Sequence, residues 1–152
     1  MTQANFTLSF SVPQSPDAAF AAISNPRAWW SGEIEGNTNH VGDVFTYRYK
    51  SLHYSKQLVS ELVPDRRVAW QVKEADLTFL KDRTEWEGTT IVFDIARKRS
   101  ATEVTFTHVG LKPMVECYDA CSDAWTSLIK GSLKELIETG NTDLLELDAP
   151  AA

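Results

Sequence analysis

The first part of the chain alternates between apolar and polar side chains. Between residues 5 and 12 the apolar residues occupy every second position, and this period of two predicts a half-buried strand. A short helix should follow, because Ser15 suits a helix N-cap and Pro16 fits the first helical position. The pair Asn25-Pro26 would end this helix.

A second short helix is predicted from Pro26 to Trp30, and it carries two adjacent tryptophans. Neighbouring side chains on a helix point in different directions, so Trp29 and Trp30 are not expected to face inward together. Packing against the first helix is favoured; the alternative is that one indole is exposed or closes the mouth of a cavity. Residues 31–43 are rich in Gly and Asn and are predicted to be an irregular connection.

The middle of the chain, from Val44 to His108, is predicted to be antiparallel strands. Alternating or continuous apolar residues mark five segments, at 45–49, 58–63, 68–72, 91–95 and 104–108. With the first strand they make a sheet of about six strands. Residues 75–88 are longer than a tight turn and carry Leu80 and Trp86, so they form either a flap or an extension of the strands.

A long helix is predicted from Pro113 to about Gly140, since Pro suits a first helical turn and Gly suits a left-handed stop. A helical wheel gathers one inward face: Cys117, Tyr118, Cys121, Ala124, Trp125, Leu128, Ile129, Ser132 and Leu136. Small and large side chains mix on this face. The helix could therefore stand off the sheet and leave a cavity, or sheet residues could fill every gap.

The two cysteines, Cys117 and Cys121, lie four residues apart on the inward face. A disulfide between them is not expected, because residues at this helical spacing hold their Cβ atoms about 5–6 Å apart and a bridge needs about 3.5–4.5 Å. The helix dipole lowers a thiol pKa only in the first turn of a helix, and both cysteines lie beyond that turn. They are therefore expected to fill the core as small apolar side chains and not to act as catalytic nucleophiles. No set of four ligands at a recognisable spacing predicts a metal or other cofactor.

Composition narrows the classes of function. The chain has 152 residues, the length of one domain, and a formal charge of −6, which disfavours a nucleic-acid partner. No apolar run reaches the length of a membrane span, and the N-terminus lacks a signal peptide pattern. A cytoplasmic location is predicted, and the two cysteines agree with a reducing compartment. Residues 141–152 are predicted to be an acidic tail beyond a domain at 5–140.

The order of these elements, together with several phrases, resembles a known superfamily. The phrases are SVPQSPDAAFAAISNPRAWWS, ELVPDRRVAW, TEWEGTTIVFDI, TEVTFTHVGL and ECYDACSDAWTSLIKGSLKELIETG. They are similar to the START-like (SRPBCC, Bet v-like) superfamily, and within it to the family named for the C-terminal domain of the activator of heat-shock-protein-90 ATPase. The resemblance implies an α+β helix-grip fold, in which a curved antiparallel sheet of about six strands wraps around a long C-terminal helix.

The resemblance also implies a cavity between sheet and helix, where members of the superfamily bind lipids, sterols, hormones or polyketides. The residues expected to line it are Tyr47, Trp70, Phe93, Phe106, His108, Cys117, Tyr118, Cys121, Trp125 and Leu128. The first hypothesis is accordingly a module that binds an apolar or amphipathic small molecule.

Two other hypotheses remain open. In the first, a cyclase or hydrolase uses His108 as general acid or base, with Glu85 or Glu87 reaching its ring. In the second, the chain is an interaction module that forms a homodimer or binds a chaperone. The chaperone activators of the family carry an additional N-terminal domain, for which this sequence has no room, so a chaperone partner is less expected.

Overall fold

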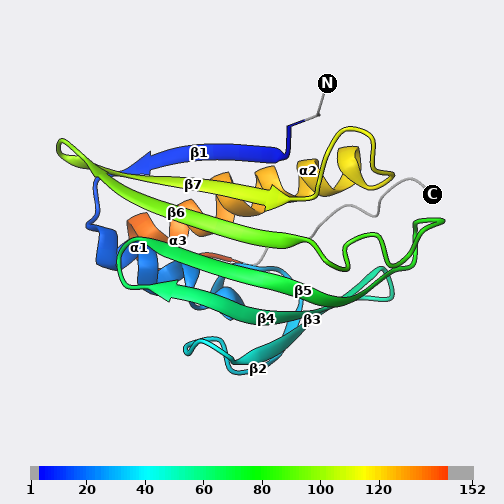
Figure 1. Cartoon of the computed structure of the whole chain (residues 1–152). Helices are drawn as coiled ribbons and strands as arrows, with labels where there is room; N and C mark the ends of the chain where they lie inside the picture. The colour runs from blue at the N-terminus through cyan, green and yellow to red at the C-terminus, as the bar shows by residue number, and fades with distance from the viewer. Residues whose placement is uncertain (1–3, 144–152) are drawn as a thin grey trace.

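The computed structural model describes residues 4–143, which form one antiparallel sheet curved around a C-terminal helical segment (Figure 1). The strands are β1 (Phe6–Val12), β2 (Glu33–Gly36), β3 (Val44–Tyr49), β4 (His53–Val63), β5 (Arg67–Leu77), β6 (Thr90–Lys98) and β7 (Ala101–Val109). Their order across the sheet is β1-β7-β6-β5-β4-β3-β2. This is the predicted α+β helix-grip fold. The predicted acidic tail lies mostly outside the described residues.

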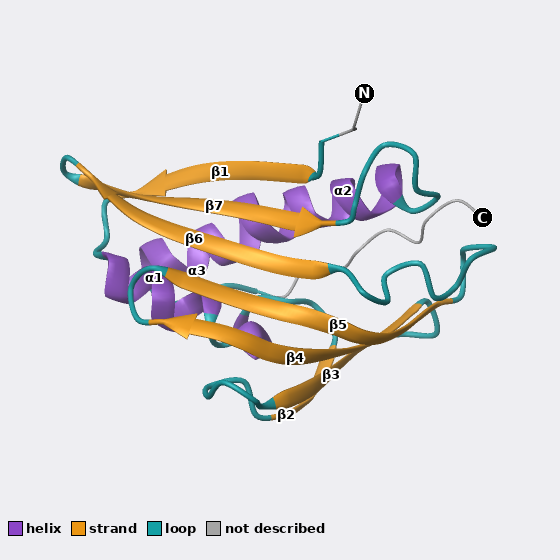
Figure 2. Cartoon of the chain, viewed as in Figure 1, coloured by secondary structure: helices purple, strands orange, loops and turns teal. Residues whose placement is uncertain are grey.

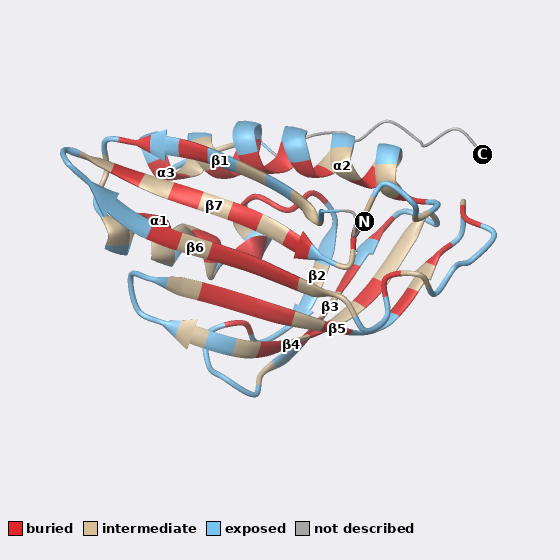
Figure 3. Ribbon diagram, turned by 45° about the horizontal axis from the view of Figure 1, so that its top comes forward, coloured by how far each residue is buried: buried red, intermediate tan, exposed pale blue. Residues whose placement is uncertain are grey.

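The helices lie on the concave face of the sheet (Figure 2). They are α1 (Pro16–Ile23), the 3-10 turn η1 (Pro26–Ala28), α2 (Tyr118–Ser127), the π-helical turn η2 (Leu128–Leu133) and α3 (Lys134–Thr139). The last three run without a break and make one long rod. Buried residues concentrate along β5, β6 and β7 and on the side of the rod that faces the sheet (Figure 3).

The sheet has a seventh strand that the sequence pattern did not predict. Within the segment expected to be irregular, β2 pairs with β3, and Ile34 lies opposite Tyr47. Gly36 ends the strand at φ +103°, where a Cβ atom would come within 2.4 Å of the Val44 carbonyl oxygen. The strand was missed because its four residues are too few and too polar to show an alternating pattern.

The C-terminal rod differs from the prediction at its start and in its phase. Residues before Tyr118 form turns, so the helix begins five residues after Pro113. The π-helical turn accommodates an extra residue and rotates the inward face. As a result Leu133 and Ile137 are buried, whereas Leu136 is only half-buried.

Both adjacent tryptophans are buried, so the expectation that they do not face inward together was wrong. Their exposed fractions are 0% for Trp29 and 2% for Trp30. The favoured packing against the first helix is found, since Trp29 Nε1 donates to the Ala22 carbonyl of α1 at 3.1 Å. The helical turn ends at Ala28, and the backbone of Trp29 leaves the helical region. The two indoles can therefore stack with a centroid distance of 6.2 Å and enter the core together.

The connection between β5 and β6 combines the two alternatives that the sequence left open. Strand β5 continues as far as Leu77, and residues 78–89, here called the flap, follow as a series of turns. Leu80 and Trp86 of the flap are buried in the core. The flap is therefore a packed part of the fold.

Candidate functional site

A pocket lies between α2, the flap and the end of the sheet formed by β3 and β4. Its cavity volume is about 80 Å³, and the pocket is open to solvent on one side. The lining residues are Trp30, Tyr47, Tyr49, Leu52, His53, Phe79, Trp86, Ala120, Cys121, Ala124, Trp125 and Leu128. The walls are thus mostly aromatic, and none of these side chains is an acid, a lysine or an arginine.

The middle of the sheet is filled and carries no comparable space. Trp70, Phe93 and Phe106 are each 0% exposed. The Phe93 ring meets the rings of Trp70 and Phe106 edge to face, with centroid distances of 5.2 and 5.3 Å. Such contacts between aromatic rings stabilise a core beyond the area that they bury. The concave face therefore has one packed region and one hollow end.

The size of the side chains on the rod accounts for this difference. Near the pocket, α2 presents Ala120, Cys121 and Ala124, which are too short to reach the sheet. Farther along, Ile129 and Leu133 are fully buried. At the pocket the small residues lie beside the larger Trp125 and Leu128, and the space is on the side of the small ones.

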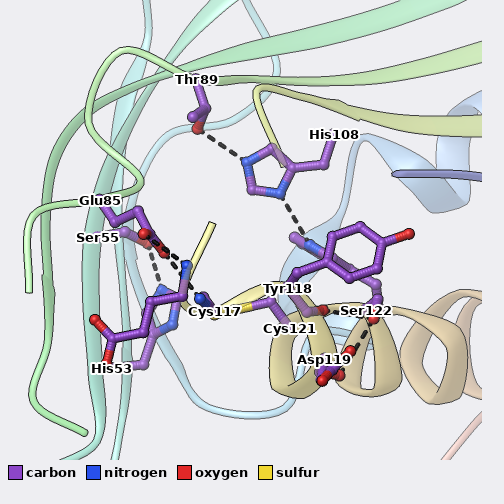
Figure 4. The surroundings of a disulfide bond; sticks show 12 residues. His53, Ser55, Glu85, Thr89, His108, Cys117, Tyr118, Asp119, Cys121 and Ser122 are labelled. Atoms are coloured by element: carbon purple, nitrogen blue, oxygen red, sulfur yellow. Dashed lines mark hydrogen bonds between the residues drawn. A yellow bond between two sulfur atoms is a disulfide. The ribbon is translucent and has the colours of Figure 1, made fainter. Parts of the chain in front are cut away.

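His108 sits at the end of β7, fully buried, with a hydrogen bond at each ring nitrogen (Figure 4). Trp125 Nε1, which can only donate, lies 3.1 Å from Nδ1. The ring proton is therefore on Nε2 and is donated to Thr89 Oγ1 at 2.9 Å. Burial lowers the pKa of His108 to about 3, so the ring is neutral at neutral pH. It has no unused nitrogen with which to move a proton.

His53 is a pocket residue that the sequence pattern did not single out. It opens β4, and its ring lies in the pocket wall against Trp86, with a centroid distance of 4.5 Å. Its Nε2 lies 2.9 Å from Ser55 Oγ. Burial, and secondarily the nearby His108, lower the pKa of His53 to about 3. The signal that could have revealed it is the alternation of His53, Ser55 and Gln57 along β4, which is polar and therefore not apparent as a core pattern.

The cysteines form a disulfide, contrary to the expectation from the sequence (Figure 4). The expectation assumed that both residues lie within a regular helix. Cys117 instead precedes the first residue of α2, and its Cα atom lies 5.5 Å from that of Cys121, inside the range for disulfides. Cys121 faces the pocket, so the disulfide forms part of its rim.

Two carboxylates join the flap to the start of α2: one belongs to the flap and bonds to the residues before α2, and the other belongs to those residues and bonds to the flap. Glu85 of the flap accepts hydrogen bonds from the backbone N–H groups of Glu116 and Cys117, both at 2.9 Å. Glu116 in turn accepts from the backbone N–H groups of Lys81 and Asp82, and these bonds lower its carboxyl pKa. The bonds to Glu85 satisfy N–H groups that have no partner within the helix. The flap thus holds Trp86 in the pocket wall.

The residues predicted for the cavity fall into three groups. Tyr47, Cys121, Trp125 and Leu128 come together around the pocket. Trp70, Phe93 and Phe106 lie in the packed region, and Cys117 is buried at the start of α2. His108 lines a narrow crevice behind Trp86, and Tyr118 is half-buried against Phe6.

Across residues 4–143, no cluster of three or more His, Cys, Asp or Glu side chains is arranged to hold a metal ion. No helix in that range is long and apolar enough to cross a membrane.

Comparisons with known proteins agree with the fold. A comparison with curated sequences gave no match. The solution structure of the Aha1 dimer from Colwellia psychrerythraea is similar with a TM-score of 0.73 and 24% identity, over 91% of this chain and 99% of that one. DynU16, a protein of the dynemicin biosynthetic locus, has a TM-score of 0.63 and 17% identity, over 91% of this chain and 50% of that one.

A third solved structure, CalU16 from Micromonospora echinospora, has a TM-score of 0.62 and 12% identity, over 88% of this chain and 76% of that one. At these identities the three likenesses concern the fold alone. The family described as Activator of Hsp90 ATPase homolog 1-like protein matches residues 13–138, which is most of the chain. The chain therefore belongs to the family of Activator of Hsp90 ATPase homolog 1-like proteins, within the START-like superfamily.

Proposed function

We propose that this protein binds a small, largely apolar molecule in the pocket between α2, the flap and β4. The observation that carries the proposal is a hollow walled by aromatic rings at one end of an otherwise packed core. Ligand pockets in proteins are usually concave and apolar, with a few polar groups that orient the ligand. His53 supplies such a group here, while Tyr47 donates its hydroxyl to the Ser31 carbonyl.

Native mass spectrometry of gently purified protein tests the proposal, because a bound molecule adds its mass to the folded chain. Tryptophan fluorescence gives a second readout, since Trp30, Trp86 and Trp125 line the pocket. Ala124→Phe should fill the space and abolish binding while the protein stays folded. The matched control is Ala21→Phe, an exposed position on α1. Equal binding by both variants and the wild type would place the ligand elsewhere.

We also infer that a homodimer is a candidate assembly, because the similar Colwellia protein was solved as a dimer. Light scattering of the purified chain measures the mass directly. A value near 17.0 kDa, the mass of one chain, would rule the dimer out at the concentration used.

The enzymatic alternative has less support than the binding module. It depends on His108 as the acid or base, and both nitrogens of that ring are occupied by hydrogen bonds to Trp125 and Thr89. A cytoplasmic location and a chaperone partner stay predictions from the sequence.

A further inference from the structure

The inward face of β4 carries an unusual row of polar side chains. His53, Ser55 and Gln57 alternate along the strand, and Ser55 and Gln57 are both 0% exposed. Buried polar groups destabilise a fold unless they are hydrogen-bonded to one another or to the backbone. Here they bond along the row: Gln57 Nε2 donates to Ser55 Oγ at 2.5 Å, and Ser55 Oγ lies 2.9 Å from His53 Nε2. Gln57 Oε1 is buried and has no hydrogen-bond partner among residues 4–143.

The direction of these bonds sets the position of the proton on His53. The Ser55 hydroxyl has one proton, and it already accepts a hydrogen bond from Gln57. Its other partner is His53 Nε2. The oxygen could accept a second hydrogen bond, but the buried Ser55 proton would then have no partner among residues 4–143, so donation to His53 Nε2 is the favoured arrangement. The low pKa keeps the ring neutral, and a neutral ring has one N–H. That proton is therefore on Nδ1, which has no hydrogen-bond partner among residues 4–143.

His53 and His108 thus hold opposite tautomers, and both rings contact Trp86, at centroid distances of 4.5 and 4.7 Å. In His108 the N–H is used by Thr89. In His53 the N–H belongs to a ring that lines the pocket and makes no hydrogen bond to another residue of the range 4–143.

The remaining walls restrict the ligand further. Trp30 stacks on Tyr47 at 4.0 Å, and Trp86 stacks on Trp125 at 5.8 Å, so flat rings border the space. No ionisable carboxylate, ammonium or guanidinium lines it. A charged ligand would lose its hydration there without gaining a counter-charge, which is unfavourable.

We propose that the pocket selects a neutral, flat aromatic molecule with a carbonyl oxygen that accepts a hydrogen bond from Nδ1–H of His53. This inference rests on the proposed binding function and names the ligand class for the same pocket. The aromatic part lies among the tryptophan and tyrosine rings. The carbonyl distinguishes this class from hydrocarbons of the same shape.

Three matched probes test the ligand class: 1-tetralone, which is a two-ring aryl ketone, tetralin, which lacks the oxygen, and 1-naphthoate, which is ionised. Their dissociation constants are measured by tryptophan fluorescence and checked by the loss of binding in Ala124→Phe. Wild type should bind 1-tetralone about fivefold more tightly than tetralin, the factor expected for one neutral hydrogen bond. It should bind 1-naphthoate most weakly.

Two variants test whether His53 is the source of the preference for 1-tetralone over tetralin. In His53→Phe the ratio of the two dissociation constants should fall to about one. In Ser55→Ala, which is outside the pocket lining, the ratio should fall because Nε2 loses the hydroxyl that fixes the tautomer. Histidine-ring ¹⁵N NMR of the wild type should show the Nδ1–H form for His53 and the Nε2–H form for His108.

The outcomes separate the two proposals. Equal affinity of wild type for tetralin and 1-tetralone, tighter binding of 1-naphthoate, or an Nε2–H tautomer at His53 would overturn the ligand class and leave the binding function standing. If none of the three probes binds up to its solubility limit, the ligand class is overturned, and a co-purifying molecule in native mass spectrometry that Ala124→Phe loses would still support the binding function.

Discussion

The packed middle and the hollow end of the concave face lie under the same helical rod but are built from different residues. In the middle, Trp70 and Phe93 from the sheet leave no space, and the rod adds large side chains such as Ile129. At the hollow end the rod presents the small Ala120 and Ala124 beside Trp125. The first region accounts for the stability of the fold. The second provides the space in which we propose that a ligand binds.

The two buried histidines differ in a similar way, in the hydrogen bonds of their ring nitrogens. His108 has hydrogen bonds at both nitrogens, as a structural core residue should. His53 has a bond at Nε2 only, and it borders the pocket. A buried histidine is therefore informative only when the partners of both its nitrogens are known.

The largest expected effect is a difference in the free energy of unfolding between a mutation in the packed middle and one at the hollow end. Phe93→Ala should lower the free energy of unfolding by about 3–5 kcal/mol, because it empties a fully packed site. Phe79→Ala removes a half-buried ring from the pocket wall and should cost less than about 2 kcal/mol. Urea unfolding of the two variants measures the difference. Equal losses would mean that the hollow end is as well packed as the middle.

The disulfide should contribute less than the packed core, because it closes a very short loop. A loop of about five residues corresponds to about 2 kcal/mol in the chain-entropy account of disulfides. Urea unfolding with and without dithiothreitol should reveal a loss of that size or less. Alkylation by iodoacetamide before reduction provides the control: two alkylated cysteines at that stage would show that the bond is absent in solution.

Stability should fall in mild acid, since the pKa of each buried histidine is about 3 in the folded chain and about 6.5 in the unfolded chain. Between these values the unfolded chain binds more protons, so the free energy of unfolding falls as the pH decreases below 6.5. At pH 5.5 the loss is about 1.4 kcal/mol for His108 and smaller for His53, which is partly exposed. Comparing wild type with His108→Gln at pH 5.5 and 7.5 isolates the first contribution. An unchanged dependence on pH in the variant would contradict the assignment.

The smallest of these effects concerns the bonds between the flap and α2. Glu85→Ala removes a carboxylate that accepts two backbone N–H groups and should cost about 1 kcal/mol. Hydrogen exchange should accelerate in residues 78–89 and at the start of α2. Glu35→Ala, at an exposed position on β2, is the control and should leave that exchange unchanged. Equal exchange in both variants would show that Glu85 does not hold the flap.

Much of the fold could be predicted from alternating side chains, and the exceptions have local causes. Strands such as β7 show a regular apolar alternation, and the helix-grip order follows from the sequence of elements. Strand β2 was missed because it is short and polar. The phase of the rod changes at η2, and no residue pattern in LIKGSL indicates a π-helical turn.

The site was less predictable, because a sequence shows which side chains face inward but not whether others fill the space beside them. Trp70 and Trp125 were both expected at a cavity, yet the first lies in the packed middle and the second lines the pocket. His53 escaped notice because Ser55 and Gln57 make the inward side of β4 polar. Its role becomes visible only when the register of β4 and the hydrogen bonds are known.

The contrast between the two regions can be tested directly by solving a crystal structure under xenon pressure, because xenon enters apolar space that side chains leave empty. Xenon should appear between Trp86 and Ala124 and be absent around Trp70 and Phe93. A pocket without xenon, or xenon among the rings of the packed middle, would contradict the central claim that this fold is hollow at one end and filled at its centre.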